Sequence, residues 1–257
     1  MTIVAVFTGP AGSGKSTLVA TYTHWLKREL FLRVAPVNLD PGAELLKYKP
    51  VFDIRSLFTL RDIMTKYGLG PNGAFLKASE LIVENVDKVF NSEPFTNLSK
   101  WDIVLIDTPG QMEAFIFRKS SAIFFDELEK ISQPVLVYVL DASAVYTLAD
   151  AITLWFMSVL LQAKLGLTVV PVVNKVDIAS DIEPLKLLVE KPDELFKIAK
   201  EKAEEGLLSE IIPELLSIAI KTKAPLRTVF VSATTGQGIR DMHMLIHEAF
   251  CTCGDLT

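Results

Sequence analysis

Glycines, a lysine and a serine lie together near the N-terminus at a spacing that could bind phosphate groups. Residues 9–16 read GPAGSGKS and fit the pattern G-x-x-x-x-G-K-[ST], with an apolar run before them at 3–7 and a helical pattern after them at 17–30. Glycines let backbone N–H groups turn inward on a phosphate, and the helix N-terminus adds its positive dipole. The alternative is a glycine turn before a helix, but the order of strand, loop and helix favours binding of a nucleoside triphosphate.

Within this loop, Lys15 would reach the β- and γ-phosphates and the Ser16 hydroxyl would ligate Mg²⁺. The motif does not specify the base. The full set of residues predicted to bind phosphate is Gly9, Gly12, Ser13, Gly14, Lys15, Ser16 and Thr17.

A second motif, Asp107-Thr-Pro-Gly110, follows an apolar run at 103–106. The carboxyl end of a strand is where open α/β sheets bind ligands, so Asp107 can hold Mg²⁺ and the Gly110 N–H can sense a γ-phosphate. Alone, this tetrapeptide is more often a turn; downstream of a phosphate loop it favours a nucleotide switch. Gln111 follows, at the position that orients the attacking water in Ras-like enzymes, although a polar residue in a first helical turn is the alternative.

The base is indicated by Asn174-Lys175-Val176-Asp177, which follows the apolar run at 169–173 and has the N-K-x-D form found in GTPases. The Asp177 carboxylate can accept from guanine N1–H and from the exocyclic amine, whereas adenine offers no donors at the matching positions. Such a site discriminates strongly because the wrong base leaves buried polar groups unpaired. Asn174 would tie the loop together, and the Lys175 stem would lie against the ring.

Two weaker motifs support this interpretation. Ser232-Ala233-Thr234 follows the run at 228–231 and is similar to the S-A-K segment of GTPases, in which a backbone N–H donates to guanine O6. Asp40-Pro41-Gly42 follows the run at 33–38, and its acid could approach Mg²⁺ or position the water from the side opposite Gln111. Asp-Pro-Gly is also strong turn chemistry, so both alternatives stay open.

The amino-acid composition limits the kinds of molecule and compartment with which the protein is expected to be associated. The 257 residues carry a net charge of −5 without a basic stripe, which argues against a general nucleic-acid surface. The N-terminus enters the first strand directly, and the longest apolar run, 144–163, contains Asp150 and Gln162, so we expect neither a signal peptide nor a membrane span. A cytoplasmic protein is therefore expected. Cys251 and Cys253 lack the spacer of zinc and redox motifs, and we expect free thiols.

The elements that must position these motifs alternate along the chain. Near-continuous apolar runs, typical of central parallel strands, recur at 3–7, 33–38, 103–106, 135–140, 168–173 and 228–231. Apolar spacings of three and four predict helices at 17–30, 74–90, 111–131, 145–165, 193–221 and 239–250. This alternation predicts an α/β fold: a mostly parallel central sheet with helices on both faces, in the three-layer arrangement of P-loop NTPases, with helical insertions.

The spacing between motifs narrows the family. Asp107 stands 92 positions after Lys15, far more than a Ras-like domain uses, and this interval contains Gly70-Pro71-Asn72. G-P-N between a GPAGSGKST loop and a DTPGQ switch closely resembles the GPN-loop GTPases, in what looks like a short, archaeal-type form. The NLDP run at 38–41 fits as well, although Gly42 stands where an alanine is expected. The resemblance covers essentially the whole chain.

This resemblance implies a homodimer of the dimerising branch that includes signal-recognition and MinD-like proteins. The Gly70-Pro71-Asn72 loop of one subunit would reach the phosphate end of the nucleotide in the other, where Asn72 contacts phosphate or product. Pro10 stands where MinD-like members carry a second lysine. The catalytic set that the resemblance implies, with Ser16, Asp107 and Asp40 toward Mg²⁺, is Lys15, Asp40, Asn72, Asp107 and Gln111.

The expected activity is Mg²⁺-dependent hydrolysis of GTP to GDP and phosphate. Because eukaryotic relatives are linked to RNA polymerase II assembly, a nucleotide-gated assembly factor for RNA polymerase or another complex is one role. A slow switch whose main output is client binding is the alternative, and an ATP-dependent kinase would leave two motifs unexplained. We expect a single P-loop GTPase domain over 1–257, with a GPN-bearing insertion at 41–100 and a helical insertion at 178–225.

Apolar segments at 115–117, 123–125 and 154–157 could line a groove that responds to the nucleotide. Ordinary core packing is the favoured alternative for any one of them.

Overall fold

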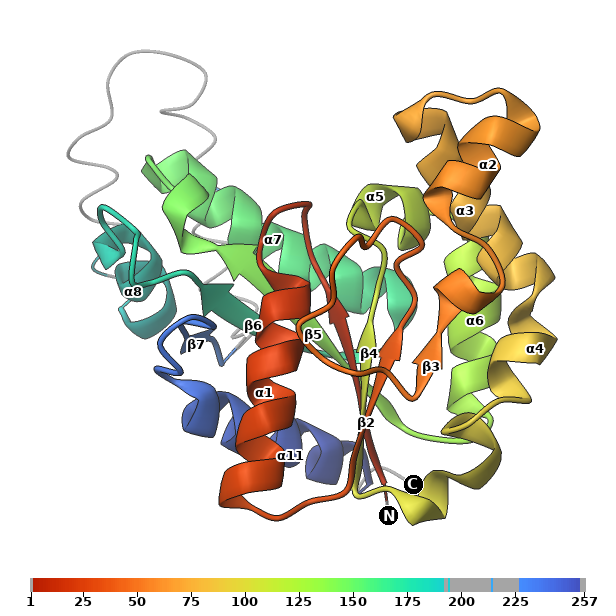
Figure 1. Cartoon of the computed structure of the whole chain (residues 1–257). Coiled ribbons are helices and arrows are strands. Elements are labelled where there is room, and N and C mark those ends of the chain that lie inside the picture. Colours follow the sequence, from red (N-terminus) through yellow and green to blue (C-terminus); the bar gives the residue numbers. More distant parts are fainter. Residues whose placement is uncertain (1, 192–193, 195–213, 215–226, 255–257) are drawn as a thin grey trace.

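Parallel strands form one seven-stranded sheet in the part of the chain that the computed structural model describes, residues 2–191, 194, 214 and 227–254 (Figure 1). The strand order is β3-β2-β4-β1-β5-β6-β7. The α/β expectation is therefore confirmed, with every pairing parallel. The strands are β1 (Ile3–Thr8), β2 (Val34–Asn38), β3 (Phe52–Asp53), β4 (Ile103–Asp107), β5 (Pro134–Asp141), β6 (Thr168–Asn174) and β7 (Val229–Phe230).

Both faces of β1 are buried, which explains its continuous apolar sequence. Side chains alternate between the two faces of a strand, and here Ile3, Ala5 and Phe7 join one core cluster while Val4 and Val6 join another. Each cluster requires its own helical cover, so the sheet must be the middle of three layers.

Two helices, α1 and α11, supply apolar residues to the cluster on one face, and helices from α3 to α8 supply the cluster on the other. Figure 1 shows α1 and α11 together in front of the sheet. The helices are α1 (Lys15–Glu29), α2 (Leu60–Tyr67), α3 (Pro71–Glu84), α4 (Val86–Phe90), α5 (Met112–Phe115), α6 (Lys119–Glu129), α7 (Leu148–Leu165), α8 (Glu183–Glu190) and α11 (Ile239–Gly254).

The strand predictions were wrong in two respects. The run at 228–231 forms β7, but this strand lies at the edge of the sheet rather than in its centre and is only half-buried. The opposite edge strand, β3, was missed because it has only two residues, Phe52 and Asp53, too few to give an apolar period.

Two predicted helices are each divided in the structure. The 74–90 segment breaks at Asn85, whose side-chain amide donates to the Leu81 carbonyl (2.8 Å) and so satisfies the end of α3. The 111–131 segment breaks before α6, where the Ser121 hydroxyl donates to the carbonyls of Ile116 and Arg118 (2.8 Å each). Helices α2 and α8 were not predicted, and the helix expected at 193–221 lies outside the described residues except for 194 and 214.

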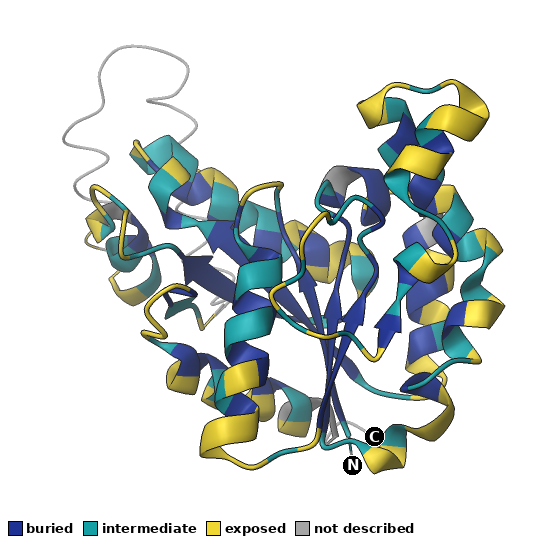
Figure 2. Cartoon of the chain, in the orientation of Figure 1, coloured by how far each residue is buried: buried dark blue, intermediate teal, exposed yellow. Residues whose placement is uncertain are grey.

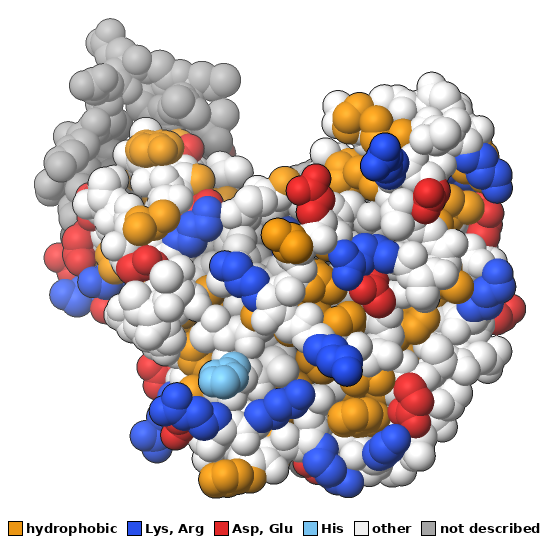
Figure 3. Space-filling view, viewed as in Figure 1, with side chains coloured by type: hydrophobic (Ala, Val, Ile, Leu, Met, Phe, Trp, Pro, Cys, Tyr) orange, Lys and Arg blue, Asp and Glu red, His pale blue; other side chains and the backbone are white. Residues whose placement is uncertain are grey.

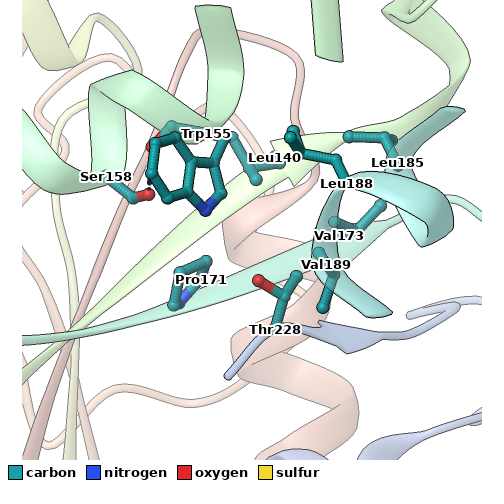
Figure 4. A pocket seen from close by; sticks show the side chains of 9 residues that line it. All are labelled: Leu140, Trp155, Ser158, Pro171, Val173, Leu185, Leu188, Val189 and Thr228. Carbon is teal, nitrogen blue, oxygen red and sulfur yellow. Dashed lines mark hydrogen bonds between the residues drawn. The ribbon is translucent and has the colours of Figure 1, made fainter. Parts of the chain in front are cut away.

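The long apolar run forms α7, which begins at a capping box made by Thr147 and Asp150. Among the described residues, it is the one helix long and apolar enough to cross a membrane by length and composition, and 28% of its window is buried. Its Trp155 side chain faces a cavity of about 10 Å³ between β5, β6 and α8 (Figure 4), which is large enough for one water at most.

Most of the aromatic segments that could have lined a groove belong to the core. Phe115, Phe124 and Phe125 are buried, whereas Phe117 and Ile123 are 39% and 45% exposed. Ordinary packing therefore accounts for the three buried rings.

Helices α2 and α3 form a hairpin with a small core of its own around Ile63, Ala74 and Ala78. A capping box of Thr59 and Asp62 starts α2, and Gly68, at φ +62°, ends it in the left-handed conformation that glycine adopts most easily. Figure 2 shows the end of this hairpin exposed.

Candidate functional site

The phosphate loop connects β1 to α1, and its glycines are required by both space and conformation. Gly14 caps α1 at φ +89°, and a Cβ there would lie 2.5 Å from the Asn174 side-chain nitrogen. Gly9, at φ +150°, passes against the Val139 carbonyl of the neighbouring strand β5. A side chain at either position would clash and strain the backbone.

Lys15 is buried and folded back on backbone carbonyls. Its Nζ donates to the carbonyls of Gly9 (2.8 Å), Pro10 (2.9 Å) and Gly110 (3.2 Å). A buried ammonium needs such acceptors because it has lost its hydration. The contact to Gly110 brings the phosphate loop and the Asp107–Gly110 motif together, as their sequence positions predict.

A pocket of about 270 Å³ opens at this junction. The space-filling view shows the same face of the molecule hollowed between the side of α7 and the side of the α2–α3 hairpin, with acidic and basic side chains interspersed (Figure 3). The pocket is lined by Gly12, Gly14, Lys15, Ser16, Thr17, Asp40 and Gly110.

Asp107, at the end of β4, is fully buried. Its Oδ2 accepts from the Tyr48 hydroxyl (2.8 Å), while its Oδ1 is buried without a hydrogen-bond partner. Burial raises the pKa of Asp107 to about 6, although the adjacent Ser16 hydroxyl and the hydrogen bond from Tyr48 oppose the rise. The site thus holds a carboxylate with one satisfied and one open oxygen, next to the Ser16 hydroxyl.

Asp40 forms the turn that Asp-Pro-Gly favours, and the residue also lines the pocket. Its Oδ1 accepts from the Gly42 N–H (2.8 Å) and its Oδ2 from the Gly110 N–H (3.0 Å). Burial raises the pKa of Asp40, although these two N–H groups oppose the rise. Asn38, at the end of β2, fixes the segment by accepting from the Asp40 N–H (3.0 Å).

The loops expected to bind the base are joined by one buried side chain. Asn174 donates from Nδ2 to the Ser13 carbonyl (2.9 Å), and its Oδ1 accepts from the Ala233 N–H (3.0 Å). It therefore links the phosphate loop, the Asn174–Asp177 loop and the Ser232–Thr234 loop. Ser232 and Ala233 are buried, and Thr234 is exposed.

Lys175 is held beside the pocket by Asp141, which was not predicted from the sequence. Lys175 adopts φ +66°, and its Nζ pairs with Asp141 Oδ2 at 2.6 Å. Although burial acts in the opposite direction, the hydrogen bond from Lys175 holds the pKa of Asp141 below its ordinary value. Asp141 ends β5, and that position at the carboxyl edge of the sheet was a usable signal. Asp177 itself is exposed.

Two predicted catalytic residues lie apart from this hydrogen-bonded cluster. Gln111 caps α5 and is half-buried, with no side-chain capping bond. Asn72 is the second residue of α3 and is exposed, as are Gly70 and Pro71. Figure 1 shows the α2–α3 hairpin standing away from the phosphate loop above α1, so the structure does not bring Asn72 to the pocket of its own chain.

The residues around the pocket suit Mg²⁺. Ser16, Asp40 and Asp107 offer only oxygen donors, which Mg²⁺ prefers, and it usually takes one or two carboxylates together with phosphate oxygens and waters. The open Oδ1 of Asp107 provides a carboxylate oxygen for this purpose.

Comparisons with known proteins agree with this arrangement. Residues 7–252 match a family model described as a conserved hypothetical ATP binding protein. The chain is 34% identical over 256 residues to a GPN-loop GTPase of Pyrococcus abyssi, covering 99% of this chain and 100% of that protein. It is 30% identical over 251 residues to GPN-loop GTPase 1 of Schizosaccharomyces pombe, covering 92% of this chain but 65% of that longer protein.

A solved structure shares the whole fold. The crystal structure of a GTPase in apo form from Pyrococcus abyssi superposes with a TM-score of 0.86, at 33% identity and over 98% of both chains. The sequence identity along the full length agrees with the order of the motifs and with the hydrogen bonds around Lys15. The chain therefore belongs to the GPN-loop GTPase family.

Proposed function

We propose that the protein is a Mg²⁺-dependent GTPase that hydrolyses GTP to GDP and phosphate and works as a homodimer. GTP hydrolysis accords with family membership; the metal and the homodimer are inferences from the site. The observation that carries the proposal is the bonding of Asn174 to Ser13 and Ala233, because it joins the loop for the base to the loop for the phosphates.

Catalysis would consist mainly of positioning and charge neutralisation. Lys15, freed from its carbonyl partners, would neutralise charge on the β- and γ-phosphates. Bound Mg²⁺ would supply further charge neutralisation, held by Ser16 and Asp107 with Asp40 nearby. Gln111 and Asp40 would align the attacking water, which lowers the barrier because the reactants no longer need to find their orientation.

Guanine selection distinguishes this function from ATP chemistry. The matching family model is described as ATP binding, whereas the similar proteins are named GTPases and the Asn174–Asp177 loop has the form that recognises guanine. An ATP-dependent kinase, the remote alternative, gives no role to that loop.

Phosphate release from GTP, measured with Mg²⁺ or with EDTA and in the presence of equal ATP, tests this proposal. We expect Mg²⁺-dependent hydrolysis that ATP does not inhibit, and loss of guanine preference in Asp177→Ala. Asp126→Ala, an exposed acid on α6, is the matched control. Competition by ATP at equal concentration would show that the assignment of Asp177 is wrong.

The homodimer is proposed because Asn72 is exposed and lies away from the pocket of its own chain. A partner subunit could then present its Gly70-Pro71-Asn72 loop to the phosphates. Lys15→Ala and Asn72→Ala proteins should each hydrolyse GTP slowly, while their mixture recovers activity, since a mixed dimer has one site with both residues intact. No recovery in a mixture shown to exchange subunits would contradict cross-subunit action.

Two outputs remain candidates for this cycle: plain turnover, and a slow nucleotide-gated switch that assembles RNA polymerase or another complex. Turnover with and without polymerase subunits separates them, because fast unaided hydrolysis favours the enzyme and GTP-dependent capture of a client favours the switch.

We place the protein in the cytoplasm, without direct nucleic-acid or membrane binding. We treat the chain as one domain, with insertions at 41–100 and 178–225.

A further inference from the structure

Tyr48 contacts the centre of the site although it belongs to none of the nucleotide motifs. It lies in the segment between β2 and β3, and its ring packs against the core cluster formed by α1, α11 and one face of the sheet. Its hydroxyl donates to Oδ2 of Asp107 at 2.8 Å, across 59 positions of sequence. The half-buried ring thus packs against the core while the hydroxyl reaches a buried carboxylate.

The two oxygens of Asp107 differ because of this contact. Oδ2 is occupied by the Tyr48 hydroxyl, whereas Oδ1 is buried and has no hydrogen-bond partner. The Ser16 hydroxyl lies beside the same carboxylate. A carboxylate fixed through one oxygen presents the other in a defined direction, and outer partners of this kind orient metal ligands in many proteins.

We propose that Tyr48 is a positioning residue for Mg²⁺, whose hydroxyl holds Asp107 so that Oδ1 is presented, directly or through water, to the metal that Ser16 also ligates. This inference rests on the proposed Mg²⁺-dependent function. A different role, in which Tyr48 blocks the carboxylate and must withdraw before metal binds, is disfavoured by the open Oδ1 and by the packing of the ring against the core.

The two roles predict opposite effects of removing the hydroxyl. Tyr48→Phe keeps the ring and its packing. The affinity for a fluorescent GDP analogue is measured in EDTA and across a Mg²⁺ titration, so that the readout is metal-dependent binding and not turnover. Tyr146→Phe, a tyrosine that is 79% exposed, is the matched control, and thermal unfolding of each variant is recorded alongside.

We expect Tyr48→Phe to need about 10-fold more Mg²⁺ than wild type for the same tightening of GDP, as outer partners of metal ligands typically contribute. Its GDP affinity in EDTA and the behaviour of Tyr146→Phe should match wild type. Stronger Mg²⁺ binding would identify a block, and an equal loss with and without metal would identify plain packing; either result overturns the inference. If wild type hydrolyses GTP equally well in Mg²⁺ and in EDTA, the proposed function fails instead.

Discussion

The candidate site has a base end, formed by the loops at 174–177 and 232–234, and a phosphate end, formed by the phosphate loop with Asp40 and Gly110. The polar groups of the two ends are hydrogen-bonded in different ways. At the base end, Asn174 already bonds to both Ser13 and Ala233, and these contacts leave the neighbouring Asp177 exposed for a ligand. At the phosphate end, groups suited to binding phosphate are bonded to the protein itself: Lys15 to three carbonyls and the Gly110 N–H to Asp40.

The hydrogen bonds of the base end are therefore already formed without nucleotide, whereas groups of the phosphate end would have to exchange their hydrogen-bond partners when a nucleotide binds. A nucleotide can add to the base end without breaking the bonds of Asn174. At the phosphate end, a γ-phosphate that binds in the proposed position would compete with Asp40 for the Gly110 N–H and with backbone carbonyls for Lys15. The loops proposed to sense the γ-phosphate are therefore those whose contacts would change on binding, which is the requirement for a nucleotide switch.

The largest effect should come from Asn174→Ala. This change leaves the Ser13 carbonyl and the Ala233 N–H buried and unpaired, at about 1–3 kcal/mol each, so we expect about 4 kcal/mol lower free energy of unfolding. Because the base end is preformed, urea unfolding should show the loss without nucleotide. Asn91→Ala, at an exposed helix end, is the control. A loss seen only with GDP present would mean that the nucleotide assembles the base end.

The next effect is a pH dependence from Asp107 in the nucleotide-free protein. Its folded pKa of about 6 lies above the ordinary value of 3.8, so its contribution to stability is fully present below about pH 4 and is lost as the pH rises through 6. The shift of about two units corresponds to about 3 kcal/mol. Between pH 4 and 7, wild type should lose that amount relative to Asp107→Asn in urea unfolding.

The exposed Asp126→Asn provides the comparison for this pH series, since its curve should run parallel to that of wild type. If the stability of Asp107→Asn also ran parallel to that of wild type across this pH range, the charged carboxylate of Asp107 would cost no stability in the folded protein. The polar groups of the phosphate end would then be as fully compensated as those of the base end.

The two ends also differ in how far the sequence predicts them. Lys15, Asp107 and Asn174 all follow apolar strands within recognisable motifs, and parallel strands place their carboxyl ends at one edge, so their convergence was predictable. Tyr48 was not, because its partner is 59 positions away and its segment has no periodicity. Asp141 pairs with Lys175 across 34 positions, yet its place at the end of β5 could have identified it as a residue of the site.

The boundaries of helices and strands also differ in how far the sequence predicts them. Local patterns placed the central strands, whereas the break between α3 and α4 falls at Asn85, whose backbone N–H and side-chain amide both donate to the Leu81 carbonyl. A side-chain hydrogen bond of this kind leaves no mark on the apolar spacing.

The smallest effect tests whether the phosphate end truly exchanges partners. In the nucleotide-free protein, Asp40 Oδ2 holds the Gly110 N–H, and its charge lies near Lys15. Asp40→Asn can keep the bond from Gly42 through its amide oxygen but has no second oxygen for Gly110, and it removes a negative charge that a γ-phosphate would meet. We expect a non-hydrolysable GTP analogue to bind about 10-fold more tightly, about 1.4 kcal/mol, while turnover falls because the proposed water-aligning carboxylate is lost.

GDP serves as the control ligand, since it lacks the γ-phosphate, and its affinity should change little in Asp40→Asn. Asp87→Asn, an exposed acid on α4, should leave both affinities unchanged. An equal gain for GDP and for the GTP analogue would mean that Asp40 repels any nucleotide, and no gain would mean that the Gly110 N–H is not the group being exchanged. Only a gain confined to the triphosphate supports an exchange in which the γ-phosphate takes over the position held by the Asp40 carboxylate.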